Sequence, residues 1–339
     1  MVVEEITFQE SEIRPEQFKD QEAKLFAEDL SGLLEHRDAF VHVACPACAM
    51  DDCDFAFDKY GVDFVRCLAC ETMYVNPRPT SEMLDYYYST SRYYKFWNDF
   101  VFPASEETRR EKIFRPRVEK MVEICRRLGV GNEKFLEVGA GFGTFCEELQ
   151  HQAIFENILA LEPTPSLAET CRMRGIETIQ KPIERITPDY CQADVIASFE
   201  VIEHLFSPAK FISQCFRLLA PGGLLILTCP NAKGFDIRLL NEVSDSVEPE
   251  HLNYFHPQSL SNLVEANGFV VEEVSTPGRL DAELVRKKHL DGLFGLEKYP
   301  FLHQLLTDQW DQAGALFQTF LAESGLSSHL WLVARKPFQ

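Results

Sequence analysis

The stretch FLEVGAGFGTF, residues 135–145, joins an apolar run to an acidic residue and then to three alternating glycines. The apolar run predicts a short buried strand, and TFCEELQHQ (144–152) predicts the helix that follows it. The glycines would form the turn between the two. Because a glycine has no Cβ atom, it permits a tight turn and lets a ligand lie against the main chain. The stretch therefore predicts a ligand site at the carboxyl end of a strand.

The same alternation of strand and helix continues to about residue 275. Further strands are expected at 158–162, 176–180, 194–200, 224–230 and 269–276. Helices are expected at 166–175, 207–219 and 259–268. HLWLVAR (329–335) predicts a last strand after a mostly helical insertion at 277–328. Short β-rich runs that alternate with helices indicate an α/β fold, with a mostly parallel sheet covered by helices on both faces.

Two classes of ligand use a glycine loop of this kind. A dinucleotide fingerprint has its third glycine three positions after the second, whereas Gly143 follows Gly141 by two positions and residue 144 is Thr. The form E-x-G-x-G-x-G instead resembles motif I of class I S-adenosylmethionine-dependent methyltransferases. The resemblance extends over about 134–275 and resumes at the last strand. It implies a Rossmann-like seven-stranded sheet with an antiparallel last strand, and S-adenosyl-L-methionine (SAM) as cofactor.

The resemblance also implies which residues contact the cofactor. In the family, an acid at the end of the second strand accepts hydrogen bonds from the ribose hydroxyls, and Glu162 occupies that place. The two acceptor oxygens of a carboxylate suit this task. An ordinary strand-to-helix turn would explain the glycines alone, but it would not explain the acid or the strand order. The expected cofactor contacts are Glu137, Gly139, Gly141, Gly143, Glu162, Pro163 and Glu200.

Four cysteines form two C-x2-C pairs, CPAC (45–48) and CLAC (67–70), separated by eighteen residues. This spacing predicts a tetrahedral Zn²⁺ with four thiolate ligands, and the alternative is paired buried thiols without a metal. Four thiolates saturate the ion, so we expect a structural zinc ribbon rather than a catalytic metal. The predicted ligands are Cys45, Cys48, Cys67 and Cys70.

Composition and these motifs divide the chain into four parts. We expect an acidic leader at 1–40, a zinc-ribbon domain at 41–78 and an aromatic-rich helical linker or lid at 79–130. The methyltransferase domain would cover 131–339, with the insertion inside it. The run YYYSTSRYYKFW (86–97) favours a lid over cofactor or substrate, and Tyr88 is a candidate substrate contact. The alternative is a stripe of core residues, since Tyr is common at buried surfaces.

The ribbon followed by YVNPRPT (74–80) resembles a subgroup of these methyltransferases in which a zinc ribbon precedes the SAM domain. Sugar C-methyltransferases that act on nucleotide-linked deoxysugars belong to it. The resemblance implies that Glu250 and His251 form the acid/base pair, and imidazole titrates near neutral pH. The alternative is that this pair only organises its loop. Asn231 and Tyr254 are further candidate substrate contacts.

A competing site lies in FEVIEHL (199–205). Glu200, Glu203 and His204 resemble the E-x-x-E-H cluster of ubiquinone-biosynthesis O-methyltransferases, which can bind a divalent cation. Carboxylate and imidazole ligands suit such an ion. The alternative is a helix-start network, where acids favour the positive end of the helix dipole.

The formal net charge of −20 argues against nucleic acid or anionic lipid as the main partner. The N-terminus lacks a signal peptide and no run of about 18 apolar residues occurs, so we expect a cytoplasmic protein. The sequence therefore favours a methyltransferase with a small-molecule acceptor, such as a sugar or nucleotide-sugar. A zinc-ribbon RNA methyltransferase and a non-catalytic interaction protein with a SAM fold are the alternatives. Carbon, oxygen and nitrogen acceptors all stay open, as does the oligomeric state.

Overall fold

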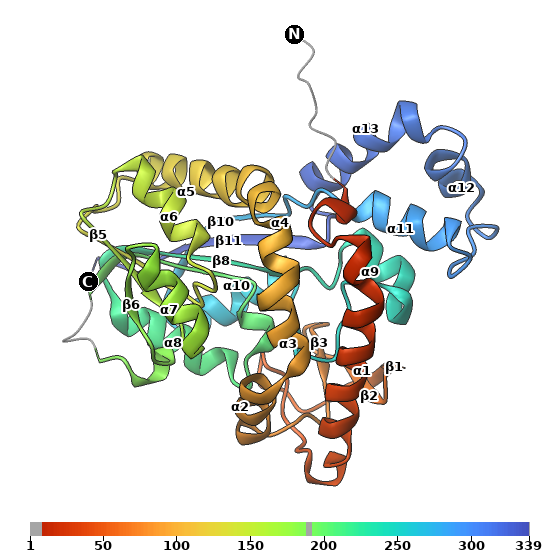
Figure 1. Cartoon of the computed structure of the whole chain (residues 1–339), viewed down its shortest axis with the longest axis horizontal. Coiled ribbons are helices and arrows are strands. Elements are labelled where there is room, and N and C mark those ends of the chain that lie inside the picture. The colour runs from red at the N-terminus through yellow and green to blue at the C-terminus, as the bar shows by residue number, and fades with distance from the viewer. Residues whose placement is uncertain (1–8, 188–191, 339) are drawn as a thin grey trace.

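The computed structural model of the chain describes residues 9–187 and 192–338 (Figure 1). Its larger sheet has seven strands in the order β10-β11-β8-β7-β4-β5-β6. β11 is antiparallel to both of its neighbours, and the other pairs are parallel. The predicted α/β fold with an antiparallel last strand is thus confirmed. The strands are β4 (Lys134–Val138), β5 (Asn157–Leu161), β6 (Glu177–Ile179), β7 (Ala193–Phe199), β8 (Leu219–Pro230), β10 (Val270–Ser275) and β11 (His329–Arg335).

Helices cover both faces of this sheet (Figure 1). Alternate side chains of each strand point to opposite faces, so Phe135 and Leu136 of β4 belong to two different hydrophobic clusters. One cluster packs under α5 and α6, and the other packs under α8 and α10. The helices are α5 (Arg115–Leu128), α6 (Thr144–Gln152), α7 (Pro165–Met173), α8 (Pro208–Leu218) and α10 (Pro257–Ala266).

The segment with the paired cysteines folds into a small antiparallel sheet in the order β1-β2-β3-β9. Three of its strands are β1 (Cys53–Lys59), β2 (Val62–Cys67) and β3 (Met73–Val75). The fourth, β9 (Asn253–Tyr254), comes from the segment after β8 and pairs with β3. The sheet of the ribbon therefore includes one strand, β9, that comes from the predicted methyltransferase domain.

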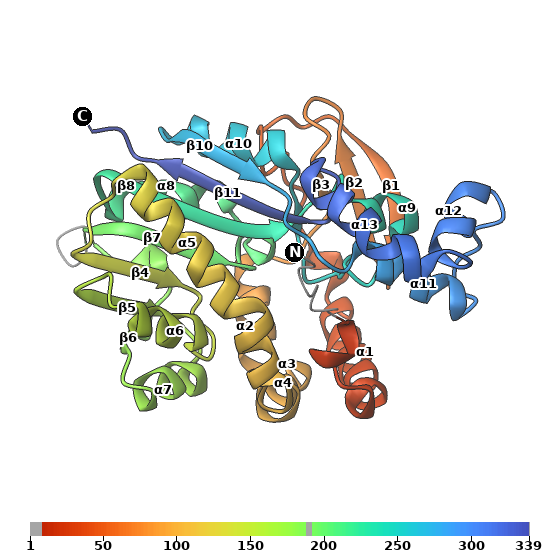
Figure 2. The same cartoon turned by 90° about the horizontal axis from the view of Figure 1, so that it is seen from above.

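Helices from the regions 9–40 and 79–130 form a layer beside the ribbon (Figure 2). The long α1 (Lys19–Leu34) runs next to α3 (Arg92–Phe96), and the rings of Phe26 and Tyr93 meet with centroids 5.6 Å apart. The region 79–130 contains α-helices with two π-helical turns between them. Its first helices are α2 (Ser81–Thr90), α3 (Arg92–Phe96) and α4 (Phe102–Arg109).

The insertion at 277–328 is mostly helical and has a small hydrophobic core of its own, which it shares with Leu240 of α9 (Phe235–Leu240). Its helices are α11 (Asp281–Leu290), α12 (Pro300–Leu306) and α13 (Trp310–Glu323). Among all helices in the described residues, none is both long and apolar enough to cross a bilayer.

Candidate active site

A cavity of about 2210 Å³ opens at the carboxyl ends of β4, β5 and β7. Pockets for a single drug-sized ligand measure roughly 300–1,000 Å³, so this one has room for two molecules. Its lining combines the glycine loop and the ends of these strands with α2, α3 and the start of the insertion. These segments are far apart in the sequence, and the fold brings them together around one cavity.

The three glycines of the loop serve different purposes, although all have positive φ angles. A Cβ atom on Gly139 would lie 2.5 Å from Cγ2 of Val201, and one on Gly143 would lie 2.6 Å from Cδ1 of Ile176. A Cβ atom on Gly141 would meet nothing within 4 Å. Gly139 and Gly141 line the cavity, whereas Gly143 does not. Gly143 therefore permits close packing, and Gly141 leaves bare main chain open to a ligand.

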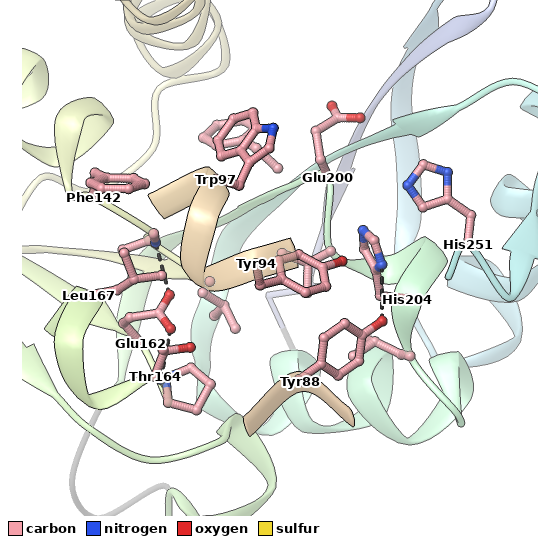
Figure 3. A pocket seen from close by; sticks show the side chains of 18 of the residues that line it. Tyr88, Tyr94, Trp97, Phe142, Glu162, Thr164, Leu167, Glu200, His204 and His251 are labelled. Atoms are coloured by element: carbon pink, nitrogen blue, oxygen red, sulfur yellow. Dashed lines mark hydrogen bonds between the residues drawn. The ribbon is translucent and has the colours of Figure 1, made fainter. Parts of the chain in front are cut away.

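Glu162 lies directly after β5 and is 5% exposed. Its Oε2 accepts the N–H of Gly141 at 2.9 Å, and its Oε1 accepts the N–H of Thr164 at 2.8 Å (Figure 3). Burial raises the pKa of this carboxyl group, although both N–H donors oppose the shift. Each oxygen keeps a further acceptor site, so the carboxylate can still accept from a ligand in the cavity. Pro163 lines the cavity beside it.

Two more acids line the cavity at the ends of β4 and β7. Glu137 accepts the thiol proton of Cys146 at 3.0 Å, and burial raises the pKa of Glu137 to about 8. Glu200 has a φ of 55° and accepts the hydroxyl of Thr228 at 2.5 Å. Burial opposes ionisation of Glu200, but His329 and Arg117, each 3.6 Å from its Oε1, lower its pKa. Arg117 is thus a cation facing the same space.

Two imidazoles and a phenol gather at the opposite end of the cavity (Figure 3). The ring centroids of His204 and His251 are 4.6 Å apart, and the hydroxyl of Tyr88 is 3.2 Å from Nδ1 of His204. Burial lowers the pKa of His204 to about 3 and that of His251 to about 4. Both rings are therefore neutral at pH 7, and each has one nitrogen that can accept a hydrogen bond. Burial also raises the pKa of Tyr88, which keeps its hydroxyl protonated.

The predicted pairing of Glu250 with the His251 ring is not formed. The carboxylate of Glu250 accepts the hydroxyls of Tyr87 and Tyr94, is buried, and does not line the cavity. Each of its oxygens accepts one of these phenols, and no hydrogen bond or ion pair joins it to the His251 ring among the described residues. The carboxylate beside His251 is that of Glu248, whose Oε2 is 3.9 Å from Nε2 of the ring.

Two other expected substrate contacts do not reach the cavity. Asn231 and Tyr254 are both fully buried, and neither lines it. The amide of Asn231 donates to the carbonyl of Ser327 at 2.8 Å, which ties the end of β8 to the insertion. The hydroxyl of Tyr254 accepts the N–H of Glu248 at 2.7 Å and so braces the loop before His251. The polar groups of both side chains are therefore engaged in contacts within the protein and are not exposed to a substrate.

The four predicted zinc ligands do converge. Sγ atoms of Cys45 and Cys70 are 3.5 Å apart, as are those of Cys48 and Cys67, and all four lie within 4.8 Å of one another. A tetrahedral Zn²⁺ with Zn–S bonds of about 2.3 Å needs sulfur atoms about 3.8 Å apart. The donor set and its spacing therefore fit a structural zinc ion.

The second predicted cluster is assembled differently. Possible ligand atoms of Glu203, His204 and His251 lie within 4.8 Å of one another, and Glu200 is outside this group. Neither carboxylate oxygen of Glu203 has a hydrogen-bond partner in the described part of the chain. The E-x-x-E-H spacing alone did not indicate that His251 would join Glu203 and His204.

Several residues that line the cavity were not predicted. Tyr94 of α3 and Trp97, which begins the π-helical turn after it, lie in the aromatic run, so their residue type was a signal. Their order along the chain did not show which rings would face inward. Phe142 in the glycine loop stacks on Phe102, with ring centroids 3.8 Å apart. Arg14 approaches Glu248 at 3.6 Å across most of the sequence, and no local pattern could have indicated that contact.

Comparison with known proteins agrees with this geometry. The family described as "Methyltransferase domain" matches residues 102–274. A Mycolicibacterium smegmatis protein named as a probable S-adenosylmethionine-dependent methyltransferase is 37% identical over 86 residues, which are 25% of this chain and 32% of that protein. A ubiquinone biosynthesis O-methyltransferase of Xylella fastidiosa is 25% identical over 170 residues, 45% of this chain and 67% of that enzyme. The match thus spans about a third to two thirds of these curated relatives.

Solved structures show a weaker likeness. Phosphoethanolamine N-methyltransferase 2 of Haemonchus contortus, in complex with SAM, aligns with a TM-score of 0.43 and 17% identity, over 65% of this chain and 52% of that one. The family match, by contrast, covers more than half of the 339 residues and includes the glycine loop, Glu162 and both strands that flank them. The chain therefore belongs to the methyltransferase domain family, within the class I SAM-dependent methyltransferases that its glycine loop resembles.

Proposed function

We propose that this protein transfers a methyl group from SAM to a small polar acceptor, a sugar, nucleotide-sugar or related biosynthetic intermediate. One observation carries the proposal. A single cavity has the glycine loop and Glu162 at one end, and Tyr88, His204 and His251 at the other. Cofactor-binding chemistry and proton-accepting chemistry therefore face the same space, which is large enough for both molecules.

The residues at the first end fit the cofactor. Bound SAM would supply an electrophilic methyl group on a sulfonium ion. The free acceptor sites of Glu162 suit the two ribose hydroxyls, and the bare main chain at Gly141 permits close approach. Arg117, a half-buried cation in the lining, suits the carboxylate of the methionine part. These residues would hold the cofactor, and deprotonation of the acceptor would fall to the other end of the cavity.

The imidazoles at the second end fit a general base. When a hydroxyl or an acidic carbon of the acceptor bonds to the methyl carbon, the bond from that carbon to sulfur would break and the acceptor's proton must leave. A neutral imidazole can take the proton, and the carboxylate of Glu248, 3.9 Å from Nε2 of His251, would offset the charge that forms on the ring. Nδ1 of His251 is buried without a hydrogen-bond partner in the described residues, whereas Nδ1 of His204 already meets Tyr88. We therefore assign His251 as the base, with His204 and Tyr88 as its neighbours at the acceptor.

The test is a screen of nucleotide sugars and related acceptors with labelled SAM, with products read by mass spectrometry. His251→Gln should lower kcat by about 100-fold or more, within the range for loss of a general base, and should leave SAM affinity unchanged. His303→Gln, on α12 outside the cavity lining, is the matched control. Turnover by His251→Gln equal to wild type would remove this residue from the mechanism. Calorimetry that showed no binding of SAM to the wild-type protein would refute the whole proposal.

The same proposal includes a structural Zn²⁺ on Cys45, Cys48, Cys67 and Cys70, and the sulfur spacing supports it. In keeping with four thiolate ligands, the ion would stabilise the ribbon and would take no part in methyl transfer. Elemental analysis of the purified protein should find one zinc per chain. A zinc content near zero in protein purified without chelators would contradict this assignment.

A further inference from the structure

The side chain of Arg78 is buried among carbonyl oxygens where the ribbon meets the active-site loops. It is 1% exposed, and in the described part of the chain its hydrogen-bond acceptors are three main-chain carbonyls and one side-chain amide, none of them a carboxylate. Its Nε donates to the carbonyl of Val75 at 3.1 Å, and its Nη2 donates to that of Leu252 at 3.2 Å. Burial lowers the pKa of Arg78 to about 10. A buried charge without a carboxylate partner is costly, so these hydrogen bonds must offset the loss of water around the guanidinium.

Asn253 is the partner that extends these contacts to the His204 loop. Its Oδ1 accepts from Nη1 of Arg78 at 3.1 Å, and the same nitrogen donates to the carbonyl of Phe206 at 3.3 Å. The amide nitrogen of Asn253 faces three more carbonyls, those of Ile202 at 3.3 Å, Glu203 at 3.2 Å and Leu205 at 2.8 Å. Two side chains thus bind the main chain on both sides of His204.

The same two residues also fix the segment that contains His251. Asn253 lies two positions after it, in β9, and pairs with Tyr74 of the ribbon strand β3. The N–H of Val75 donates to the carbonyl of Leu252 at 3.0 Å. Beyond β9, Nε2 of His256 is 2.7 Å from the carbonyl of Cys70, beside the second cysteine pair. The segment with His251 is therefore attached to the ribbon along its length.

From these contacts we infer that Arg78 and Asn253 are positioning residues for methyl transfer, which hold the loops of His204 and His251 against each other on the ribbon. The inference rests on the proposed function, because it concerns the geometry of the proposed base. The ribbon would then support the acceptor site in addition to holding the proposed Zn²⁺. Neither Arg78 nor Asn253 lines the cavity, so neither can act on the acceptor directly.

Asn253→Asp is the sharpest variant. The new carboxylate keeps an acceptor for Arg78 and adds an opposite charge, so the ribbon contact persists. It loses the donor to the carbonyls of Ile202, Glu203 and Leu205, so only the His204 loop is released. Arg78→Lys is the second variant, since an ammonium keeps the charge and loses the planar fork. Lys233→Met is the control, because it breaks an exposed ribbon contact, the 2.5 Å ion pair with Glu71.

The first readout needs no acceptor. Imidazole resonances of His204 and His251, assigned with His→Gln variants, are followed by NMR against pH with S-adenosylhomocysteine present. The neighbouring titratable groups Glu200, Glu203, Glu248 and Arg14 are the same in every variant. Asn253→Asp itself adds a carboxylate, and that charge alone would raise the pKa of His204. Asn253→Ala, which releases the same three carbonyls without a new charge, is therefore measured beside it and should give the same shift. In wild type both rings should stay neutral down to about pH 5, and in Asn253→Asp the His204 ring should titrate nearer the ordinary value of about 6.5.

The second readout is steady-state kinetics. Asn253→Asp and Arg78→Lys should lower kcat about 100-fold, as expected for an ångström of misplacement, while SAM affinity changes less than twofold. The inference is overturned if both variants keep the imidazole titration and kcat of wild type, or if Lys233→Met changes them equally. If the wild-type protein neither binds SAM nor methylates any acceptor, the proposed function fails, and the titration still decides the role of Arg78 and Asn253.

Discussion

The Glu162→Gln variant tests the cofactor end of the cavity with almost no change in side-chain volume. In wild type the two oxygens of Glu162 accept the N–H groups of Gly141 and Thr164. In the variant one oxygen becomes an NH2 group, which cannot accept. A hydrogen bond to a charged acceptor is worth roughly 1.5–3 kcal/mol. Loss of one such bond to a ribose hydroxyl should therefore raise the Kd for SAM about 10- to 150-fold.

The fold should tolerate this change better than cofactor binding does. Because burial raises the pKa of Glu162, the ionised carboxylate costs folding free energy at pH 7, and the neutral amide avoids that cost. The unfavourable new contact is the meeting of two donors at Gly141 or Thr164. We therefore expect the melting temperature to change little while affinity falls.

Isothermal titration calorimetry with SAM and with S-adenosylhomocysteine measures the effect directly. Glu169→Gln, an exposed acid of α7 that pairs only with Arg172 among the described residues, is the matched control and should bind as wild type does. The reasoning is refuted if folded Glu162→Gln binds both ligands within twofold of wild type. Equal losses in both variants would show a general charge effect in place of a ribose contact.

Three further outcomes are expected. Gly143→Ala should lower the free energy of unfolding by about 2–4 kcal/mol, because the new Cβ atom adds left-handed strain and a clash with Ile176. Gly141→Ala should lower the free energy of unfolding by only about 1 kcal/mol, and it should also weaken SAM binding. Urea unfolding measures the first effect in both variants, and calorimetry measures the second. Burial raises the pKa of Glu250 from 4.5 to about 7, so its contribution to stability is present below about pH 4.5 and is lost as the pH rises through 7. Glu250→Gln should accordingly flatten stability against pH over that interval, and an unchanged slope contradicts the assignment. Cys48→Ser should abolish zinc retention and lower the melting temperature, and equal zinc content in variant and wild type would count against the four-thiolate site.

The sequence by itself determined the features whose signals are local. Gly139, Gly141 and Gly143 follow a buried strand and precede a helix, and a few adjacent residues suffice to set that turn. The alternation of short apolar runs with helices predicted the seven-stranded sheet, because side-chain periodicity follows from the geometry of each element alone. The spacing of the paired cysteines likewise predicted that their sulfur atoms would converge.

Only the tertiary structure decided how the acceptor end is built. Glu250 and His251 are adjacent in sequence, but two phenols from α2 and α3 hold the carboxylate away from the cavity, and Glu248 takes its place beside the imidazole. The addition of β9 to the ribbon sheet and the burial of Arg78 against Asn253 also join residues more than 170 positions apart. Which polar group reaches a ligand depends on which partners the folded chain brings to it first, and no local pattern contains that information.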